Sequence, residues 1–361
     1  MNASAVSIIE NLLSRAEAEN VSDIHIDPTE KNVWVRFRID GQLLEKELFS
    51  MSIFADILGR IKILAHLRTD EHMSPQDGRF RINLPVGHSI DIRVSIIPSY
   101  YGESIVLRLL ADTAHTPTLS ELGLCEEDQK KILKVISHSS GMILVTGPTG
   151  SGKTTTLYTI LKMLSASHNR SILTIEDPIE YAISGVRQVQ TNANHGLTFA
   201  SGLRALVRQD PDIIMVGEIR DKETAYIAIH TALTGHLLLS TLHTNDAATA
   251  IPRLIDMGID PYLIASTIGI IIGQRLIRKA CELCDHGCAA CNFQGYKGRV
   301  GIFEVMHSND AIQDAIMQRA PAKVLRSIAA KTGMRSMEND GLDKVEKGIT
   351  RIEEVVAAII D

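Results

Sequence analysis

Aromatic residues are scarce in this sequence, and charges of neither sign dominate it. Phe, Trp and Tyr make up 4% of the 361 residues, so the hydrophobic cores must consist mainly of aliphatic side chains. Lys and Arg number 37 against 43 Asp and Glu, which gives a formal net charge of -6. This balance lacks the overall basic field of nucleic-acid-binding proteins, although it leaves local basic patches open.

Long apolar runs of the kind that cross a bilayer are also missing. The N-terminus lacks the basic segment and the apolar stretch of a secretory signal. The most apolar region, 262–277, is interrupted by glycines and polar residues, so we predict a buried helix there rather than a membrane span. We therefore expect a cytoplasmic protein that is held at the inner face of the cytoplasmic membrane through its partners.

Cysteine is rare, and four of the five cysteines fall within 281–291. Cys125 stands alone and is expected to be a small core or surface residue. The clustered ones are Cys281, Cys284, Cys288 and Cys291. Cytoplasmic thiols stay reduced, so this pattern indicates metal ligation before disulfides. Four thiolates suit a structural zinc site; an iron–sulfur cluster, or His286 replacing one ligand, is an alternative.

The pattern of apolar residues changes near residue 112. Up to that point, two segments with helical spacing accompany three with strand-like alternation: 4–19 and 52–67, then 33–39, 79–84 and 90–96. Alternation with one polar face is typical of an antiparallel sheet, so we predict an α+β domain over 1–112. The polar segment 113–118 contains Pro117 and has no periodicity, and it is predicted to be a linker or hinge.

Beyond residue 118 the strand-like runs are short, apolar and unbroken, and they alternate with helical segments. Four of them are 142–145, 172–175, 213–216 and 237–239. Strands without a polar face must be covered on both sides, which indicates a mostly parallel sheet between helices. We therefore predict an α/β domain over 119–361.

One motif in this second domain is complete in both spacing and context. Gly147-Pro148-Thr149-Gly150-Ser151-Gly152-Lys153-Thr154 has the P-loop pattern, and it follows a predicted strand and precedes a predicted helix that begins at Thr155. Its glycines let backbone N–H groups point at phosphate oxygens, at the positive end of a helix. Lys153 is expected to bind the β- and γ-phosphates, and Thr154 to ligate Mg²⁺.

Two carboxylates that follow apolar, strand-like runs are candidates for catalytic residues. Glu218 ends the segment 212–218, whose apolar residues predict a strand leading to the phosphates. It can hold Mg²⁺ through water or orient the attacking water. Glu176 directly follows the run 172–175, and carboxylates at such positions face the ligand crevice of a parallel sheet. For Glu180, a polar turn closed by Pro178 is a plausible alternative, and it is less plausible for Glu176.

Two histidines, His236 and His243, flank the buried run 237–242. They can sense the γ-phosphate through hydrogen bonds or serve a structural role, and the spacing favours neither. No Asn-Lys-x-Asp segment, which marks guanine recognition in GTPases, is present in the sequence, so ATP is the expected nucleotide.

Four ordered segments of the second domain resemble the Walker A, Asp-box, Walker B and His-box motifs of secretion ATPases. They are the P-loop, Glu176-Asp177-Pro178-Ile179-Glu180, the run 203–212 into Gly217-Glu218-Ile219-Arg220-Asp221, and Thr234-Gly235-His236 with 240–245. The segments 22–26, 36–41, 76–79, 295–299 and Asp340-Gly341 agree as well. On these motifs the chain is identified as a member of the type II secretion and type IV pilus assembly ATPase family, over almost its whole length.

The resemblance implies a RecA-like ATPase domain preceded by a smaller, PAS-like α+β domain. It also implies a homohexameric ring, with each ATP between the two domains near a subunit boundary. Arg79 and Arg93 would be arginine fingers for the γ-phosphate, and loss of that phosphate would let the domains rotate. His243 would join the catalytic residues, and His236 and Arg208 would contact the nucleotide.

The tetracysteine segment resembles the zinc module of the assembly ATPases, which retraction ATPases usually lack. It departs from the family because only Asp285-His286-Gly287 joins its two pairs, where the family commonly has a longer connection. The chain also begins where an additional N-terminal domain of many assembly ATPases would end, as in short competence-type members.

Three functions compete on this basis. The first is a motor that uses ATP, Mg²⁺ and Zn²⁺ and drives a polytopic inner-membrane platform protein, which then assembles pilins or pseudopilins. The second is a ring ATPase for pilus retraction or DNA translocation; the acidic balance disfavours nucleic acid as a partner. The third is a nucleotide-gated scaffold without turnover, which Glu218 and the paired arginines disfavour. We expect the first, and the sequence leaves the filament and the exported substrate open.

Overall fold

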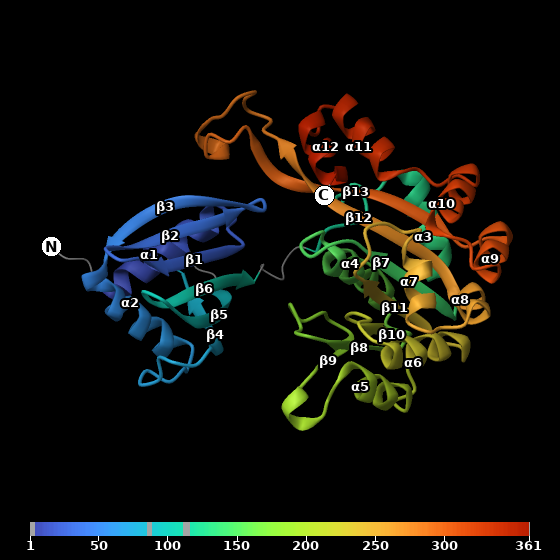
Figure 1. Ribbon diagram of the computed structural model, residues 1–361, viewed down its shortest axis with the longest axis horizontal. Coiled ribbons are helices and arrows are strands. Elements are labelled where there is room, and N and C mark those ends of the chain that lie inside the picture. Colours follow the sequence, from blue (N-terminus) through green and yellow to red (C-terminus); the bar gives the residue numbers. More distant parts are fainter. Residues whose placement is uncertain (1–3, 85–88, 111–115, 361) are drawn as a thin grey trace. The chain divides into compact units, whose positions relative to one another are not determined.

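The computed structural model describes residues 4–84, 89–110 and 116–360 of the chain (Figure 1). The chain forms two compact units, Met1–Ala114 and His115–Asp361, here called unit 1 and unit 2. Unit 1 is built on an antiparallel sheet and unit 2 on a mostly parallel one, which confirms the predicted fold class. The predicted linker 113–118 lies partly outside the described residues. In the part of the chain that is described, no helix combines the length and apolarity needed to traverse a bilayer.

Unit 1 consists of a six-stranded sheet and the helices that cover it. The strand order is β3-β2-β1-β6-β5-β4, and neighbouring strands pair antiparallel. Its elements are α1 (Ala5–Ala18), β1 (Asp23–Pro28), β2 (Asn32–Ile39), β3 (Gln42–Ser50), α2 (Met51–Leu64), β4 (Gln76–Asn83), β5 (Ser89–Ser99) and β6 (Gly102–Leu110).

Apolar periodicity explains how the helices of unit 1 pack on the sheet. In α1 the buried residues are Ile9, Leu12, Leu13 and Ala16, which recur at helical spacing. The Ser4 hydroxyl caps this helix by accepting a hydrogen bond from the Ser7 N–H at 3.2 Å. Alternate residues of β2 and β5 are buried beneath α1 and α2. The strands β1, β3 and β6 were not recognised from the sequence.

A buried ion pair joins α2 to β6 inside unit 1. The Lys62 Nζ lies 2.7 Å from the Glu103 Oε1, and the two side chains are only 1% and 5% exposed. Lys62 also donates to the Glu71 carbonyl at 2.6 Å, and the His72 Nδ1 lies 2.6 Å from the Glu103 Oε2. This network fixes the loop that leads into β4.

Unit 2 is an α/β domain whose seven-stranded sheet has the order β13-β12-β7-β11-β10-β8-β9. The neighbouring strands are parallel except for the antiparallel pair β12 and β13. Its elements are α3 (Glu126–Ile136), β7 (Gly141–Thr146), α4 (Lys153–Ser165), β8 (Ile172–Glu176), β9 (Val186–Gln190), α5 (Phe199–Val207), β10 (Ile213–Val216), α6 (Lys222–Leu233), β11 (Leu237–Leu242), α7 (Ala250–Asp256), α8 (Pro261–Thr267), β12 (Ile268–Ala280), β13 (Tyr296–His307), α9 (Asp310–Met317), α10 (Ala322–Lys331), α11 (Met337–Glu346) and α12 (Ile352–Ile360).

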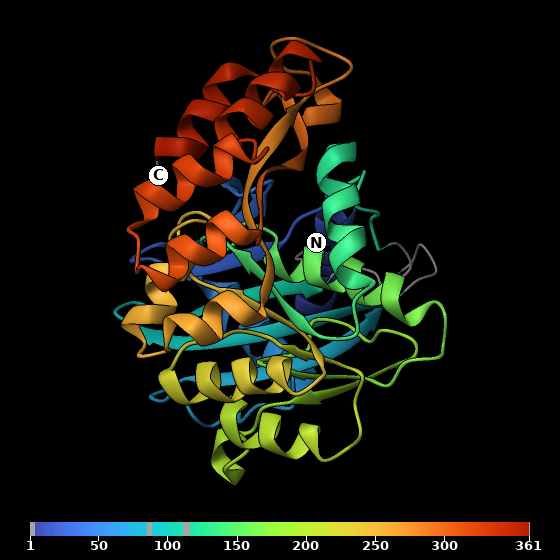
Figure 2. The ribbon, with the colours of Figure 1, turned by 90° about the vertical axis from the view of Figure 1, so that its right-hand side faces the viewer.

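Helices cover both faces of this sheet, as Figures 1 and 2 show. One face packs against α3 and α4, and the other against α5 to α10. The central strands β7, β10 and β11 are buried along almost their whole length. This burial explains why they appear in the sequence as unbroken apolar runs.

The carboxyl ends of four parallel strands meet at one edge of the sheet. In the strand register, Thr146 of β7 pairs with Leu242 of β11, and Val216 of β10 pairs with Ile175 of β8. The P-loop and the segments that begin at 177, 217 and 243 therefore all leave the sheet at this edge. Ligands of doubly wound sheets bind there.

The prediction of a buried helix over 262–277 is wrong for most of that segment. The helix α8 ends at Thr267, and β12 begins at Ile268 and inserts between β7 and β13. The β-branched residues Ile268, Ile270, Ile271 and Ile272 favour the strand, and pairing on both sides satisfies its backbone. The apolar run alone could not distinguish a buried strand from a buried helix.

The buried pair in unit 1 leads to a test of stability. Replacing Lys62 with Met should destabilise unit 1 by about 3–5 kcal/mol, because Glu103 would remain as a buried charge with only the exposed His72 beside it. The one tryptophan of the chain, Trp34 in β2, makes urea unfolding followed by fluorescence specific for unit 1.

The exposed pair Arg68–Asp70 provides the matched control, since its side chains are 71% and 72% exposed. Arg68→Met should cost less than about 1 kcal/mol. Equal losses of stability in the two variants would contradict a special contribution from the buried pair.

Candidate active site

The P-loop, residues 147–154, connects the end of β7 with the start of α4. Gly147, Gly150 and Gly152 have φ angles of +152°, +80° and +86°, which other residues rarely adopt. A Cβ atom at Gly147 would lie 2.4 Å from the backbone oxygen of Gln274 in β12. The glycine is therefore required both by the turn and by the close approach of the neighbouring strand.

Lys153 is the first residue of α4, and its ammonium group is turned back into the loop. Its Nζ donates hydrogen bonds to the backbone oxygens of Gly147 and Pro148, each at 2.8 Å. Burial lowers the pKa of Lys153 to about 8, an effect that the Glu218 carboxylate opposes and Arg275 reinforces. The side chains of Thr154 and Thr155 are exposed in the first turn of the same helix.

Glu218 lies just past β10, at the same edge of the sheet. Its Oε1 is 2.5 Å from the Arg220 Nη2, and its Oε2 is 3.2 Å from the His243 Nε2. The Glu218 side chain is 13% exposed, and its charge acts on Lys153. Three of the predicted residues, Lys153, Glu218 and His243, are thus brought together.

Glu176, the last residue of β8, is directed differently from the prediction. Its Oε1 accepts hydrogen bonds from the Thr174 Oγ1 at 2.6 Å and the Gln188 Nε2 at 3.1 Å, and its Oε2 accepts one from the Tyr158 hydroxyl. Alternation along β8 turns it toward α4, so the carboxylate is buried and does not face the open crevice. The following residue, Asp177, is exposed and raises the pKa of Arg220 together with Glu218.

Two other predicted residues lie at the opposite edge of the sheet. His236 precedes β11, whose first residue pairs with Gly141 at the start of β7, and its Nδ1 is 3.0 Å from the Thr231 backbone oxygen. The length of β11 separates it from the P-loop by about 20 Å. Arg208 follows α5 and donates to the Arg204 backbone oxygen at 3.0 Å. Within one chain, neither residue is brought to the P-loop.

Arg79 and Arg93 are directly opposed residues of β4 and β5 in unit 1. Arg108 of β6 and Asp23 of β1 continue the same row across the sheet. The Asp23 Oδ1 accepts a hydrogen bond from the Arg108 Nε at 2.8 Å, and the Asp23 Oδ2 lies 3.8 Å from the Arg38 Nε. The predicted arginines therefore belong to a cationic row on the polar face of unit 1.

The four clustered cysteines lie at the tip of the hairpin formed by β12 and β13. Their Sγ atoms all lie within 4.8 Å of one another, and three of the separations are 3.9, 3.6 and 3.8 Å. A tetrahedral site with Zn–S bonds of about 2.3 Å requires sulfurs about 3.8 Å apart. The short connection between the pairs is therefore compatible with a four-thiolate metal site.

Backbone donors favour the thiolate form of one of these cysteines. The N–H groups of Cys288 and Gly295 point at the Cys291 Sγ at 3.1 and 3.3 Å. Hydrogen bonds of this kind, the Cys288 N–H first, lower the pKa of the Cys291 thiol to about 6. His286, considered as a replacement ligand, is exposed and does not belong to the cluster.

The sequence signature of type II/IV secretion system proteins matches residues 2–357. The chain belongs to this family. Similar proteins include the type II secretion system protein HxcR of Pseudomonas aeruginosa, with 45% identity over 99% of this chain and 78% of that protein. The type II secretion system ATPase E of Vibrio cholerae is 44% identical over 98% and 75%. The type IV pilus assembly ATPase PilB of Myxococcus xanthus is 41% identical over 98% and 68%.

Two solved structures of ATPases share this fold. The Legionella pneumophila ATPase DotB has a TM-score of 0.77 at 26% identity and covers 99% of this chain and 96% of its own. The pilus retraction motor PilT with bound ADP has a TM-score of 0.72 at 28% identity, with coverages of 98% and 97%. The predicted family, its class of function as a secretion or pilus assembly ATPase, and ATP hydrolysis as its activity are confirmed.

Some residues that contact the predicted site were not identified from the sequence of this ATPase. Tyr158 and Gln188, which bind Glu176, stand in segments without a chemical motif. Arg220 was quoted within the Walker B segment, and its position two residues beyond Glu218 could have suggested their ion pair.

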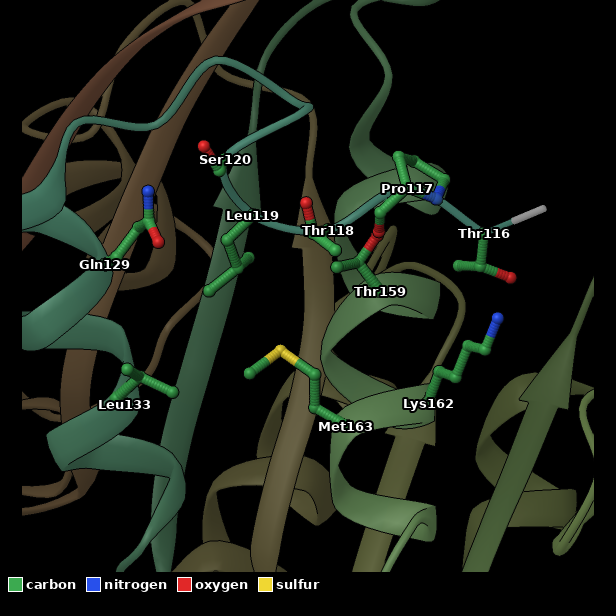
Figure 3. A pocket seen from close by; sticks show the side chains of 10 residues that line it. All are labelled: Thr116, Pro117, Thr118, Leu119, Ser120, Gln129, Leu133, Thr159, Lys162 and Met163. Carbon is green, nitrogen blue, oxygen red and sulfur yellow. The ribbon is translucent and has the colours of Figure 1, made fainter.

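A pocket of about 370 Å³ opens between α3, α4 and the segment 116–120 (Figure 3). Leu119, Leu133 and Met163 form much of its apolar lining. The Thr159 hydroxyl ties α4 to this segment by donating to the Pro117 backbone oxygen at 2.9 Å. The pocket borders the second half of α4, whereas phosphates belong at its N-terminus, so it is distinct from the phosphate site.

The lowered pKa of Lys153 predicts that the nucleotide affinity of this ATPase decreases above pH 8. Phosphate binds the charged lysine and raises its pKa, so binding takes up a proton once the free site has lost it. The association constant for ADP should fall by at most about tenfold per pH unit between about pH 8 and 9.5. Calorimetry without Mg²⁺ measures this decrease.

Lys153→Ala is the control for this titration. The variant should bind ADP weakly and with little dependence on pH, because the titrating ammonium group is gone. An affinity of the unaltered protein that stays constant over the whole pH range would contradict the assignment to Lys153.

Proposed function

We propose that this chain is a subunit of a homohexameric ring ATPase that powers assembly of a type IV pilus or a type II secretion pseudopilus. The ring would act from the cytoplasm on a polytopic inner-membrane platform protein, which assembles pilins or pseudopilins. The observation that carries the proposal is the position of Lys153 and Glu218 at one sheet edge, in a chain of the secretion ATPase family.

ATP with Mg²⁺ is the proposed ligand of this edge. The backbone N–H groups of the P-loop and the start of α4 suit phosphate oxygens. Lys153 would exchange the carbonyls of Gly147 and Pro148 for the β- and γ-phosphates. The Thr154 hydroxyl would ligate Mg²⁺, which supplies charge neutralisation at the transferred phosphoryl group.

Glu218 is the carboxylate that we assign to orienting the attacking water or holding Mg²⁺ through water. His243, 3.2 Å from its Oε2, would keep the carboxylate in place. Because Glu176 is occupied by three donors, we assign it to fixing the acidic turn at the end of β8 rather than to contact with water.

Arg79 and Arg93 are proposed to stabilise the γ-phosphate, since a row of guanidinium groups suits an oxyanion. Arg208 and His236 are left out of the phosphate site of their own chain, because they lie at the other edge of the sheet.

Zinc is the metal proposed for the four cysteines, in a structural role with no open coordination position. By the family resemblance, this module favours an assembly ATPase. Pilus retraction is the second candidate, supported by the 28% identity to PilT. The lower identity to PilT than to HxcR and the assembly ATPase PilB supports the first function.

Replacing Glu218 with Gln should lower kcat for ATP hydrolysis by at least about 100-fold and leave ATP binding intact. The change removes the charge that orients water but keeps the shape of the side chain. Steady-state phosphate release and the binding of a fluorescent ATP analogue measure the two effects separately.

Glu223→Gln is the matched control, because Glu223 is an exposed residue of α6 that pairs with Arg204. Its kcat should remain within about twofold of the unaltered enzyme, as expected for an exposed ion pair. If the Glu218→Gln variant hydrolyses ATP at an unchanged rate, the assignment of Glu218 to catalysis is wrong. If the purified ring consumes no ATP in the presence of Mg²⁺, the proposed function itself is wrong.

Protein purified under reducing conditions should contain one zinc per chain, measured by elemental mass spectrometry. Cys288→Ser should lose this zinc, since it removes one of four thiolates. Cys125→Ser should retain it, because Cys125 lies outside the cluster. Absence of zinc from the unaltered protein, or iron in its place, would contradict the proposed metal.

A further inference from the structure

Tyr158 is a fully buried residue of α4, five residues beyond Lys153. Its hydroxyl donates a hydrogen bond to the Glu176 Oε2 and accepts one from the Glu180 N–H at 3.2 Å. The Gln188 Nε2 approaches the same hydroxyl at 3.4 Å. The two N–H groups of Gln188 have closer acceptors, so the Tyr158 hydroxyl donates to Glu176 and accepts from Glu180.

The Tyr158 hydroxyl is the donor in its hydrogen bond with Glu176. Burial first, and then the charge of Glu176, raise the pKa of Tyr158. The proton therefore stays on the phenol and points at the carboxylate. The ring is held independently, because Tyr181 packs edge-on against it with ring centroids 4.6 Å apart.

The two hydrogen-bond partners of Tyr158, Glu176 and Glu180, bound the acidic turn at the end of β8. Glu176 begins this turn, and Glu180 ends it. Between them, Asp177 acts electrostatically on Arg220, which forms the ion pair with Glu218. Hydrogen bonds, the charge interaction of Asp177 with Arg220 and one ion pair thus connect the helix that carries Lys153 with the carboxylate assigned to catalysis.

We propose that Tyr158 is a positioning residue, whose hydroxyl locks the acidic turn 176–180 to the phosphate-binding helix α4. This inference rests on the proposed function, because it concerns the geometry in which Glu218 works. A displacement of α4 by bound phosphate is passed to the turn through a rigid helix and one hydrogen bond, and it reaches Glu218 through Asp177 and Arg220. The phenol touches neither nucleotide nor water in this scheme.

Tyr158→Phe tests the proposal, since it removes the hydroxyl and keeps the buried ring. It should lower kcat by about tenfold to hundredfold, as misplacement of catalytic groups does, and leave KM for ATP within about threefold. Tyr181→Phe is the matched control: it removes a hydroxyl from the adjoining ring, which interacts with Thr116. Its kcat should stay close to that of the unaltered ring.

A second variant tests the same link from its other end. Glu176→Gln keeps the shape of the acceptor but removes the charge, and it should reproduce the loss of kcat at unchanged KM. Combining it with Tyr158→Phe should add little further loss, because both changes break one unit. If Tyr158→Phe does not fold, the Glu176→Gln result decides.

The outcomes separate the inference from the function. A Tyr158→Phe ring with the kcat of Tyr181→Phe, or a Glu176→Gln ring with full kcat, overturns the positioning role while ATP hydrolysis stands. If the double variant loses kcat by the product of the two single losses, the two residues act independently, and this result also overturns the positioning role. A merely structural hydroxyl would lower the unfolding temperature and leave kcat per folded ring unchanged. Absence of hydrolysis by the unaltered ring overturns the proposed function instead.

Discussion

The parallel pairing of β7, β8, β10 and β11 is the constraint on which the rest of this ATPase depends. Because these strands run in one direction, their last residues meet at one edge although they are far apart in the sequence. The P-loop, the acidic turn 176–180 and Glu218 with His243 each lie at the end of one of these strands, and this brings them together. Helices on both faces bury the strands and hold this edge in place.

Much of this arrangement could be predicted because the motifs combine a local pattern with a strand context. The P-loop needs glycine at positive φ angles and lysine at a fixed spacing, and Glu218 follows an unbroken apolar strand. The predictions that the structure does not match also have physical causes. Strand alternation decides which face a side chain occupies, and it directs Glu176 into the helix interface. His236 precedes β11 and His243 follows it, so the two histidines lie at opposite ends of this strand and only His243 reaches the edge that carries the P-loop.

Other features depend on tertiary partners that a single segment does not reveal. An isoleucine-rich run became β12 because strands on both sides paired with it. Tyr158 has no motif, and its importance appears only when its hydroxyl is seen between α4 and the acidic turn. The buried Lys62–Glu103 pair shows the same principle in unit 1, where two residues distant in the sequence compensate each other's charge.

The hydrogen bonds of Lys153 to its own loop have a consequence for the reaction cycle. The carbonyls of Gly147 and Pro148 compete with phosphate for the same ammonium group, so a phosphate that binds Lys153 must displace both of them. Because these carbonyls oppose every phosphate at this position, they weaken the binding of ADP as well as of ATP, which favours release of the product.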